Sequence, residues 1–169
     1  MSDKFVAIIM GSDSDLPLLE LTAGILKDFN IRTEMRIASA HRTPDEVASY
    51  VTDAQRRGCQ VFIAAAGLAA HLAGAVASRT IRPVIGIPCD GGPLNGLDAL
   101  YSTVQMPGGI PVATVAVGKA GARNAAYLAA QIMALSDPEL AQRVQRQRDQ
   151  DAAAVRAKDN ALQERLNAK

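Results

Sequence analysis

The chain has 169 residues, of which 49% are hydrophobic and 21% charged, and its formal net charge at pH 7 is +1. A chain of this length suits one domain with a full core, and a near-neutral charge provides no basic field for nucleic acid or an anionic membrane. Its two cysteines stand in no metal-binding or redox spacing, and the N-terminus lacks the pattern of a signal peptide. We therefore expect a single cytoplasmic domain over residues 1–169, with no nucleic-acid or membrane partner.

Apolar runs typical of strands alternate along the chain with segments of helical periodicity. The expected strands cover residues 4–10, 32–37, 60–66, 83–88 and 111–117. The expected helices cover residues 15–29, 44–57, 69–79 and 121–135. The last three strands are apolar throughout, which indicates burial on both faces of a parallel sheet. This order predicts an α/β fold: a three-layer α/β/α domain with a parallel five-stranded, flavodoxin-like sheet.

The last segment, residues 137–169, differs in composition from residues 1–136, which we expect to form the α/β core. It opens with Asp137, Pro138 and Glu139, a typical helix start. Charges of both signs cover this segment, and its apolar stripe is thin. We expect a long C-terminal helical arm, which either lies in solvent or packs on a neighbouring subunit.

Four polar or glycine-rich segments follow the first four expected strands. They read GSDSD (11–15), SAHRTPD (39–45), GLAAHLAG (67–74) and CDGGPLNG (89–96). In open parallel α/β sheets, ligands bind beyond the carboxyl ends of the strands, so these segments should converge on one rim. Both histidines of the chain lie in them. The sequence therefore predicts one ligand site at this rim.

The GSDSD segment has features of an anion site and of a helix start. Ser12 and Ser14 present hydroxyls beside a helix N-terminus, whose free N–H groups favour a phosphate. Asp13 and Asp15 would repel a phosphate that they faced, so we expect one to cap the helix and the other to accept hydrogen bonds from a sugar diol. Capping alone explains the same residues and stays open as the alternative.

The SAHRTPD segment divides into two parts. Thr43, Pro44 and Glu46 fit a capping box, with Thr43 as the cap. His41 and Arg42 precede the cap. Histidine transfers protons near neutral pH, and arginine binds a phosphate or carboxylate through two donors. The alternative is a histidine that satisfies a loop carbonyl, beside an arginine in a surface ion pair.

The third and fourth segments combine small residues with two reactive side chains. Gly67 and Gly74 would let the backbone approach a ligand closely, and His71 lies either in the site or in the first turn of a core helix. Cys89 is a candidate nucleophile, although such cysteines more often simply pack. The sequence contains no P-loop, no dinucleotide-binding fingerprint and no nucleophile elbow, and its histidines and cysteines lack zinc-site spacing. We expect neither a metal nor a cofactor.

Several stretches together resemble the N5-carboxyaminoimidazole ribonucleotide mutase family of purine biosynthesis. They are GSDSDLP, SAHRTPD, AAHL and LNGLDALYSTVQMPGGIPVATVAVGKAGARNAA, in order over about residues 4–135. The resemblance implies an isomerase that moves the carboxyl group of N5-carboxyaminoimidazole ribonucleotide to ring carbon C4, giving 4-carboxy-5-aminoimidazole ribonucleotide, without metal, ATP or biotin. It also implies a cytoplasmic homo-octamer with sites at subunit junctions.

The resemblance further implies roles for individual residues. His41 matches the family's general acid/base, and His71 matches a residue near the base and the carboxylate, so these two are the expected catalytic residues. The first loop matches the family's phosphate and ribose contacts, and the second loop matches the residues that hold the ribonucleotide phosphate. The expected substrate-binding residues are Ser12, Ser14, Asp15, Ser39, Ala40, Arg42, Gly67, Ala70 and Leu72.

Three positions depart from the family pattern. Leu68 replaces the second glycine of the loop G-G-A-A-H-L-P-G, Ala73 replaces its proline, and Gly91 replaces a serine after the fourth strand. These differences affect the loop over the site and the carboxylate pocket. Two other functions stay open: a sister carboxylase that joins aminoimidazole ribonucleotide to free CO2, and a nucleotide-binding module without turnover.

Overall fold

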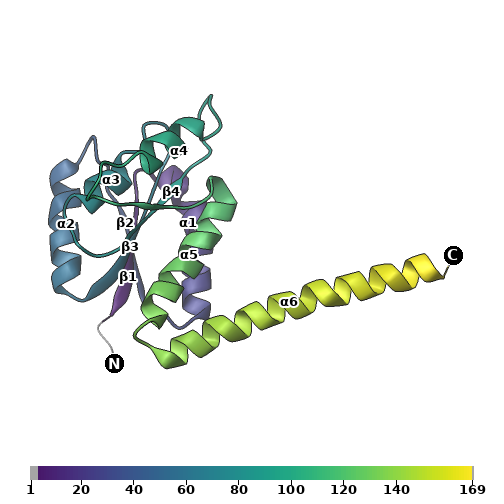
Figure 1. The fold of residues 1–169 in the computed structure, drawn as a ribbon. Helices are drawn as coiled ribbons and strands as arrows, with labels where there is room; N and C mark the ends of the chain where they lie inside the picture. Colours follow the sequence, from purple (N-terminus) through teal and green to yellow (C-terminus); the bar gives the residue numbers. More distant parts are fainter. Residues whose placement is uncertain (1–3, 169) are drawn as a thin grey trace.

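The computed structural model describes residues 4–168 and is built around a parallel five-stranded sheet in the order β2-β1-β3-β4-β5 (Figure 1). The strands are β1 (Phe5–Met10), β2 (Thr33–Ile37), β3 (Cys59–Ala66), β4 (Val84–Pro88) and β5 (Ala113–Thr114). This is the order of flavodoxin-like doubly wound folds, whose ligands bind where the strand order reverses, here between β1 and β3. The predicted α/β fold is confirmed.

Helices cover both faces of the sheet and complete the three layers (Figure 1). They are α1 (Leu16–Asp28), α2 (Pro44–Arg56), α3 (Leu72–Ala77), α4 (Leu97–Val104), α5 (Gly118–Ala134) and α6 (Pro138–Asn167). Side chains alternate along each strand, so Ile8 packs into the core with α1 and α5, and Ile9 into the core with α2 and α3. This double burial is the physical reason for the uninterrupted apolar sequence of β1.

α5 lies close to the sheet and to α1 because its buried face consists of glycine and alanine. That face comprises Gly118, Gly121, Ala122, Ala125, Ala126, Ala129 and Ala130. Thr22 of α1 is fully buried, and its hydroxyl donates a hydrogen bond to the carbonyl oxygen of Ala122 at 2.8 Å. A polar group buried in this way is tolerated only when it is hydrogen-bonded, so this contact fixes α1 against α5.

Two elements differ from the sequence-based expectations. The fifth strand is only two residues long, and Ala113 is exposed rather than buried. It pairs on one side alone, with β4, and Pro111 has no N–H group to extend the ladder. The second difference is α4, a helix that the sequence pattern did not predict. It begins after Gly96, which has a left-handed backbone (φ 84°) instead of the usual capping side chain.

The C-terminal helix α6 projects away from the α/β core for most of its length (Figure 1). Asp137 caps its N-terminus by accepting a hydrogen bond from the backbone N–H of Leu140 at 3.0 Å. Leu140 and Val144 are buried against the core, whereas residues 145–168 are almost entirely exposed. The predicted long helical arm is therefore present, and it leaves the core after two turns. Within residues 4–168, no helix is both long and apolar enough to cross a membrane.

Candidate active site

A cavity of about 520 Å³ opens at the carboxyl ends of β1, β2, β3 and β4. All four polar segments contribute to its wall, so the convergence predicted from the sequence occurs. Of the expected site residues, the cavity is lined by Ser12, Ser14, Asp15, Ser39, Ala40, His41, Arg42, Gly67, His71 and Leu72. Ala70 is not part of the lining and is buried.

The first loop contains a short 3-10 helix, η1 (Asp13–Asp15), and both Ser14 within it and Ser12 before it line the cavity. The Ser12 hydroxyl oxygen accepts hydrogen bonds from the Ser14 hydroxyl at 2.9 Å and from the Ser14 backbone N–H at 3.3 Å. Ser12 is thus the cap of η1, as the capping interpretation predicts, and it still lines the cavity. Capping and ligand contact are compatible in this loop.

Asp15 occupies the cap position of α1, but its side chain makes no capping hydrogen bond. Burial raises the pKa of this carboxyl above its ordinary value, while a hydrogen bond from the Cys89 thiol partly opposes the shift. Asp15 lines the cavity, and none of the ion pairs among residues 4–168 involves its carboxylate. Such a group is available to accept hydrogen bonds from ligand hydroxyls.

Cys89 lies at the end of β4 and is buried. Burial, together with the nearby Asp15 carboxylate, raises the pKa of the Cys89 thiol to about 12. A nucleophilic cysteine requires the thiolate, which this environment disfavours. This environment therefore favours a packing role for Cys89, whose thiol lies 3.9 Å from the Ile87 carbonyl oxygen, over nucleophilic catalysis.

The second loop is organised by Ser39. Its hydroxyl oxygen accepts hydrogen bonds from the backbone N–H groups of His41 (3.3 Å) and Arg42 (3.2 Å). The Thr43 hydroxyl accepts from the Ser39 backbone N–H at 2.9 Å. Thr43 is at the predicted cap position of α2, but the predicted capping box is wrong because its side chain makes no hydrogen bond to the helix. The Thr43 hydroxyl bonds to Ser39 within the loop instead. The loop is fixed before any ligand arrives.

Arg42 is exposed, and one guanidinium nitrogen lies 3.5 Å from the Gly11 carbonyl oxygen at the end of β1. Among residues 4–168 it has no carboxylate partner within ion-pair distance. The surface ion pair that the sequence left open is therefore absent from the described structure. The guanidinium spans the gap between the first two loops and keeps most of its donors for an anionic ligand.

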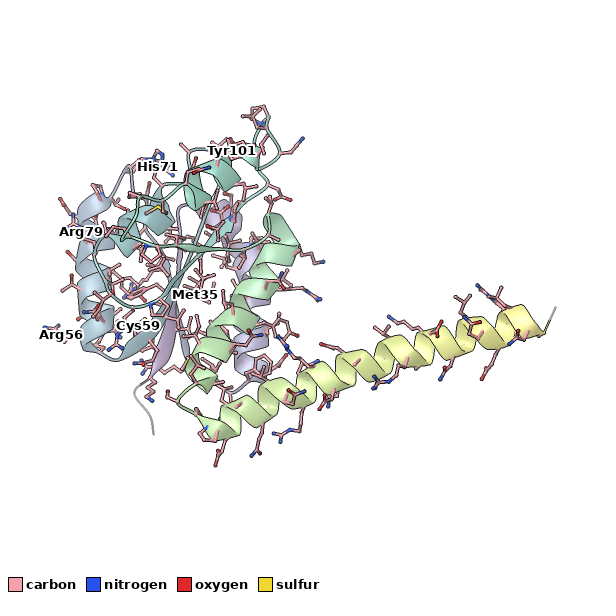
Figure 2. All side chains as sticks on the ribbon, viewed as in Figure 1. Met35, Arg56, Cys59, His71, Arg79 and Tyr101 are labelled. Carbon is pink, nitrogen blue, oxygen red and sulfur yellow. The ribbon has the colours of Figure 1, made fainter. Side chains whose placement is uncertain are left out.

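The two histidines of the chain meet at the cavity. His41 Nε2 lies 2.8 Å from His71 Nδ1, and the rings stand edge to face with centroids 5.0 Å apart. Both side chains are exposed. His71, labelled in Figure 2, lies just before the first residue of α3 and is not buried in the protein core. In this hydrogen bond one ring must donate and the other accept. The pair can therefore pass a proton between two ring nitrogens at the edge of the cavity.

Further cavity residues were not among those expected to bind a ligand. They are Gly11, Ala66, Leu68, Ala69, Cys89, Gly91 and Gly92. The sequence had marked Cys89 as a candidate nucleophile, and Leu68 and Gly91 as departures from the family pattern. The other four carry no polar side chain to mark them, and only the position of each loop relative to its neighbours reveals them.

Asp15→Asn is expected to stabilise the fold while weakening ligand binding. Because burial raises the pKa of Asp15, the folded protein binds a proton there more readily than the unfolded chain, so the ionised form lowers the free energy of unfolding at neutral pH. The neutral amide should raise Tm by about 2 °C. The gain should shrink as the pH falls and the wild-type carboxyl becomes neutral. Thermal unfolding at neutral and mildly acidic pH checks this; a lower Tm at neutral pH contradicts it.

Comparison with known proteins gives concordant results. The family model described as AIR carboxylase matches residues 5–154. The N5-carboxyaminoimidazole ribonucleotide mutase of Thermotoga maritima is 51% identical over 159 residues, which are 94% of this chain and 92% of the relative. The enzyme of that name from Escherichia coli K12 is 52% identical over 139 residues, 82% of each chain. The crystal structure of Treponema denticola PurE superposes with a TM-score of 0.86 at 34% identity, covering 94% of this chain and 98% of that one.

Proposed function

Since the chain belongs to the AIR carboxylase family, we propose that it is an N5-carboxyaminoimidazole ribonucleotide mutase of purine biosynthesis. It is an isomerase that moves the carboxyl group from the exocyclic nitrogen to ring carbon C4. The observation that carries this function is the identity of about 50% to relatives of that name over up to 94% of the chain. The cavity that holds His41 and His71 supplies the chemistry.

The ribonucleotide would lie across the first two loops. Ser12 and Ser14 offer hydroxyls and Arg42 a guanidinium to the phosphate, since an arginine without an ionic partner favours a dianion strongly. Asp15 accepts hydrogen bonds from the ribose hydroxyls, because its carboxylate is not used for capping. Ser39 acts one step away, by holding the backbone of His41 and Arg42. The aminoimidazole base would then face the third loop, with Ala40, Gly67 and Leu72 around it.

The histidine pair would carry the proton transfers. Protonation of the exocyclic nitrogen weakens its bond to the carboxylate, and CO2 departs with the nitrogen keeping the bonding electrons. The enamine-like C4 attacks the CO2, and removal of the C4 proton restores the aromatic ring. One imidazole can donate the first proton and accept the second, and the partner ring keeps it oriented through the 2.8 Å hydrogen bond. Holding CO2 beside the ring makes the second step effectively unimolecular.

An ultraviolet assay with two alternative substrates tests this function against the sister carboxylase. We expect conversion of N5-carboxyaminoimidazole ribonucleotide without release of free CO2. Activity that requires aminoimidazole ribonucleotide and high bicarbonate would identify a direct carboxylase instead. Binding of the nucleotide without turnover of either substrate would show that the protein is a nucleotide-binding module and not an enzyme.

We also infer a cytoplasmic homo-octamer. The arm α6 exposes Val155, Leu162 and Leu166, and it has few contacts with its own core. A neighbouring subunit would cover such a helix, whereas charges of both signs keep it compatible with solvent before assembly. For the octamer that the family resemblance implies, light scattering should give about eight times the chain mass of 17.8 kDa. A monomer at micromolar concentration contradicts the assembly.

A further inference from the structure

The part of the second loop that carries His41 and Arg42 is a closed turn, residues 39–43. Its ends are Ser39 and Thr43, and the Thr43 backbone N–H donates to the Ser39 carbonyl oxygen at 2.9 Å. The Thr43 hydroxyl joins the same two ends: it accepts from the Ser39 backbone N–H at 2.9 Å and donates to the Ser39 carbonyl oxygen at 3.3 Å. The Thr43 side chain thus holds both backbone polar groups of Ser39.

The turn lies between two segments that the core fixes. Ala38, which precedes it, is buried, and its backbone N–H donates to the Met10 carbonyl oxygen at the end of β1 at 2.9 Å. Pro44, which follows it, begins α2, and Val47 of this helix is buried in the core. Because both flanks are fixed, the hydrogen bonds across the turn determine the path of residues 40–42.

His41 and Arg42 both depend on this path. Their backbone N–H groups donate to the Ser39 hydroxyl at 3.3 Å and 3.2 Å. Their side chains reach separate loops: His41 lies 2.8 Å from a ring nitrogen of His71. The Arg42 guanidinium lies 3.5 Å from the Gly11 carbonyl oxygen. A rotation of Ser39 would therefore move the histidine and the arginine together.

We propose that Thr43 is a positioning residue that governs both proton transfer and phosphate binding, by fixing Ser39. This role rests on the proposed mutase function. Thr43 does not line the cavity, so it acts through Ser39 and not on the substrate. Helix capping does not explain its hydroxyl, since the side chain makes no capping hydrogen bond to α2. Misplacing a catalytic group by about 1 Å can cost on the order of 100-fold in rate, so a side chain outside the cavity can control the reaction.

Thr43→Val tests this role, because valine keeps the branched shape and removes the hydroxyl. The Ser39 backbone N–H then loses its partner, and an unpaired, partly buried N–H group is unfavourable, so the turn should rearrange. We expect kcat to fall about tenfold and KM to rise about fivefold, since His41 carries the chemistry and Arg42 the binding. Steady-state kinetics, corrected for the folded fraction, measures both constants. A loss of stability alone would change neither constant of the folded enzyme.

Two further variants separate the hydroxyl from other effects of the substitution. Thr43→Ser keeps the hydroxyl and loses the methyl group, so both constants should stay within about twofold of wild type. Thr52→Val is the matched control. The Thr52 hydroxyl donates to the Ala48 carbonyl oxygen at 3.0 Å, with the same four-residue spacing as the bond from Thr43 to Ser39. Thr52 is exposed on α2 and does not line the cavity, so its variant should have wild-type kinetics.

Binding of ribose 5-phosphate, measured by calorimetry, tests the positioning of Arg42 without turnover. Thr43→Val should bind this probe about fivefold more weakly than wild type. Wild-type kinetics in Thr43→Val overturns the positioning role and leaves the mutase intact. Equal losses in Thr43→Ser or in Thr52→Val also overturn it, since the Thr43 hydroxyl would not be the cause. If wild type fails to convert the substrate, the mutase assignment is wrong, and equal binding of the probe by wild type and Thr43→Val would then overturn the positioning role as well.

Discussion

His41→Asn is expected to lower kcat about 1,000-fold, within the range that removal of a general acid/base produces. Asparagine occupies a similar volume and keeps hydrogen-bonding groups, but it cannot exchange a proton near neutral pH. The loop should survive, because Ser39 holds it through the backbone N–H groups of residues 41 and 42 rather than through the imidazole. KM should therefore stay within a few-fold of wild type, as measured by steady-state kinetics.

His71→Asn provides the matched comparison, since it removes the other half of the 2.8 Å pair. We expect a smaller loss of kcat, because His41 remains but loses the partner that orients its ring. If the two rings act as one unit, the double variant should be no slower than His41→Asn alone. Full turnover in His41→Asn would show that the acid/base role belongs to another group.

The strand ends explain why much of the site could be predicted from the sequence. Parallel strands with continuous apolar sequence leave few places for polar residues, so the carboxyl-end loops at 11–15 and 39–45 were identifiable from the order of residues alone. The placement of His41 and Arg42 ahead of a proline-initiated helix then followed from local helix-start chemistry. Helix-start chemistry and strand order together were enough to predict that these residues lie at one cavity.

Other features depend on distances between segments that are remote in sequence. The hydrogen bond between His41 and His71 joins loops 30 residues apart, and no periodicity encodes it. The Thr43 hydroxyl can either cap α2 or bond within its loop, and in the structure it accepts from the Ser39 backbone N–H instead of capping the helix. α4 was missed because Gly96 starts it through backbone conformation, with no capping side chain to indicate a helix.

Gly121→Ala is expected to reduce the free energy of unfolding by about 3–5 kcal/mol, which is more than the roughly 1–3 kcal/mol that overpacking usually costs. Gly121 is buried in the first turn of α5, and a Cβ there would overlap the carbonyl oxygen of Ala116 and lie 2.8 Å from its carbonyl carbon. Both are backbone atoms, so no side-chain rotation relieves the clash. Tm should fall by roughly 10 °C in thermal unfolding.

Gly24→Ala is the control for this effect, because it adds the same methyl group to an exposed interior position of α1. A Cβ at Gly24 meets nothing within 4 Å, so the change should be neutral or stabilise the fold by about 0.5–1 kcal/mol through helix propensity. Comparable losses in the two variants would mean that the backbone contact with Ala116 is not the cause.

The clash between the added methyl group in Gly121→Ala and the Ala116 carbonyl should also affect the active site. The turn before α5 supports the cavity loop 89–96: a Cβ on Gly118 would lie 2.9 Å from the Asp90 carboxylate, and one on Gly96 would lie 2.6 Å from Val117. Displacing this turn to accommodate the added methyl group therefore shifts the loop that carries Gly92. We expect kcat/KM of Gly121→Ala to fall further than its folded fraction explains, even well below its Tm. Activity that simply follows the folded fraction would show that the turn supports stability alone.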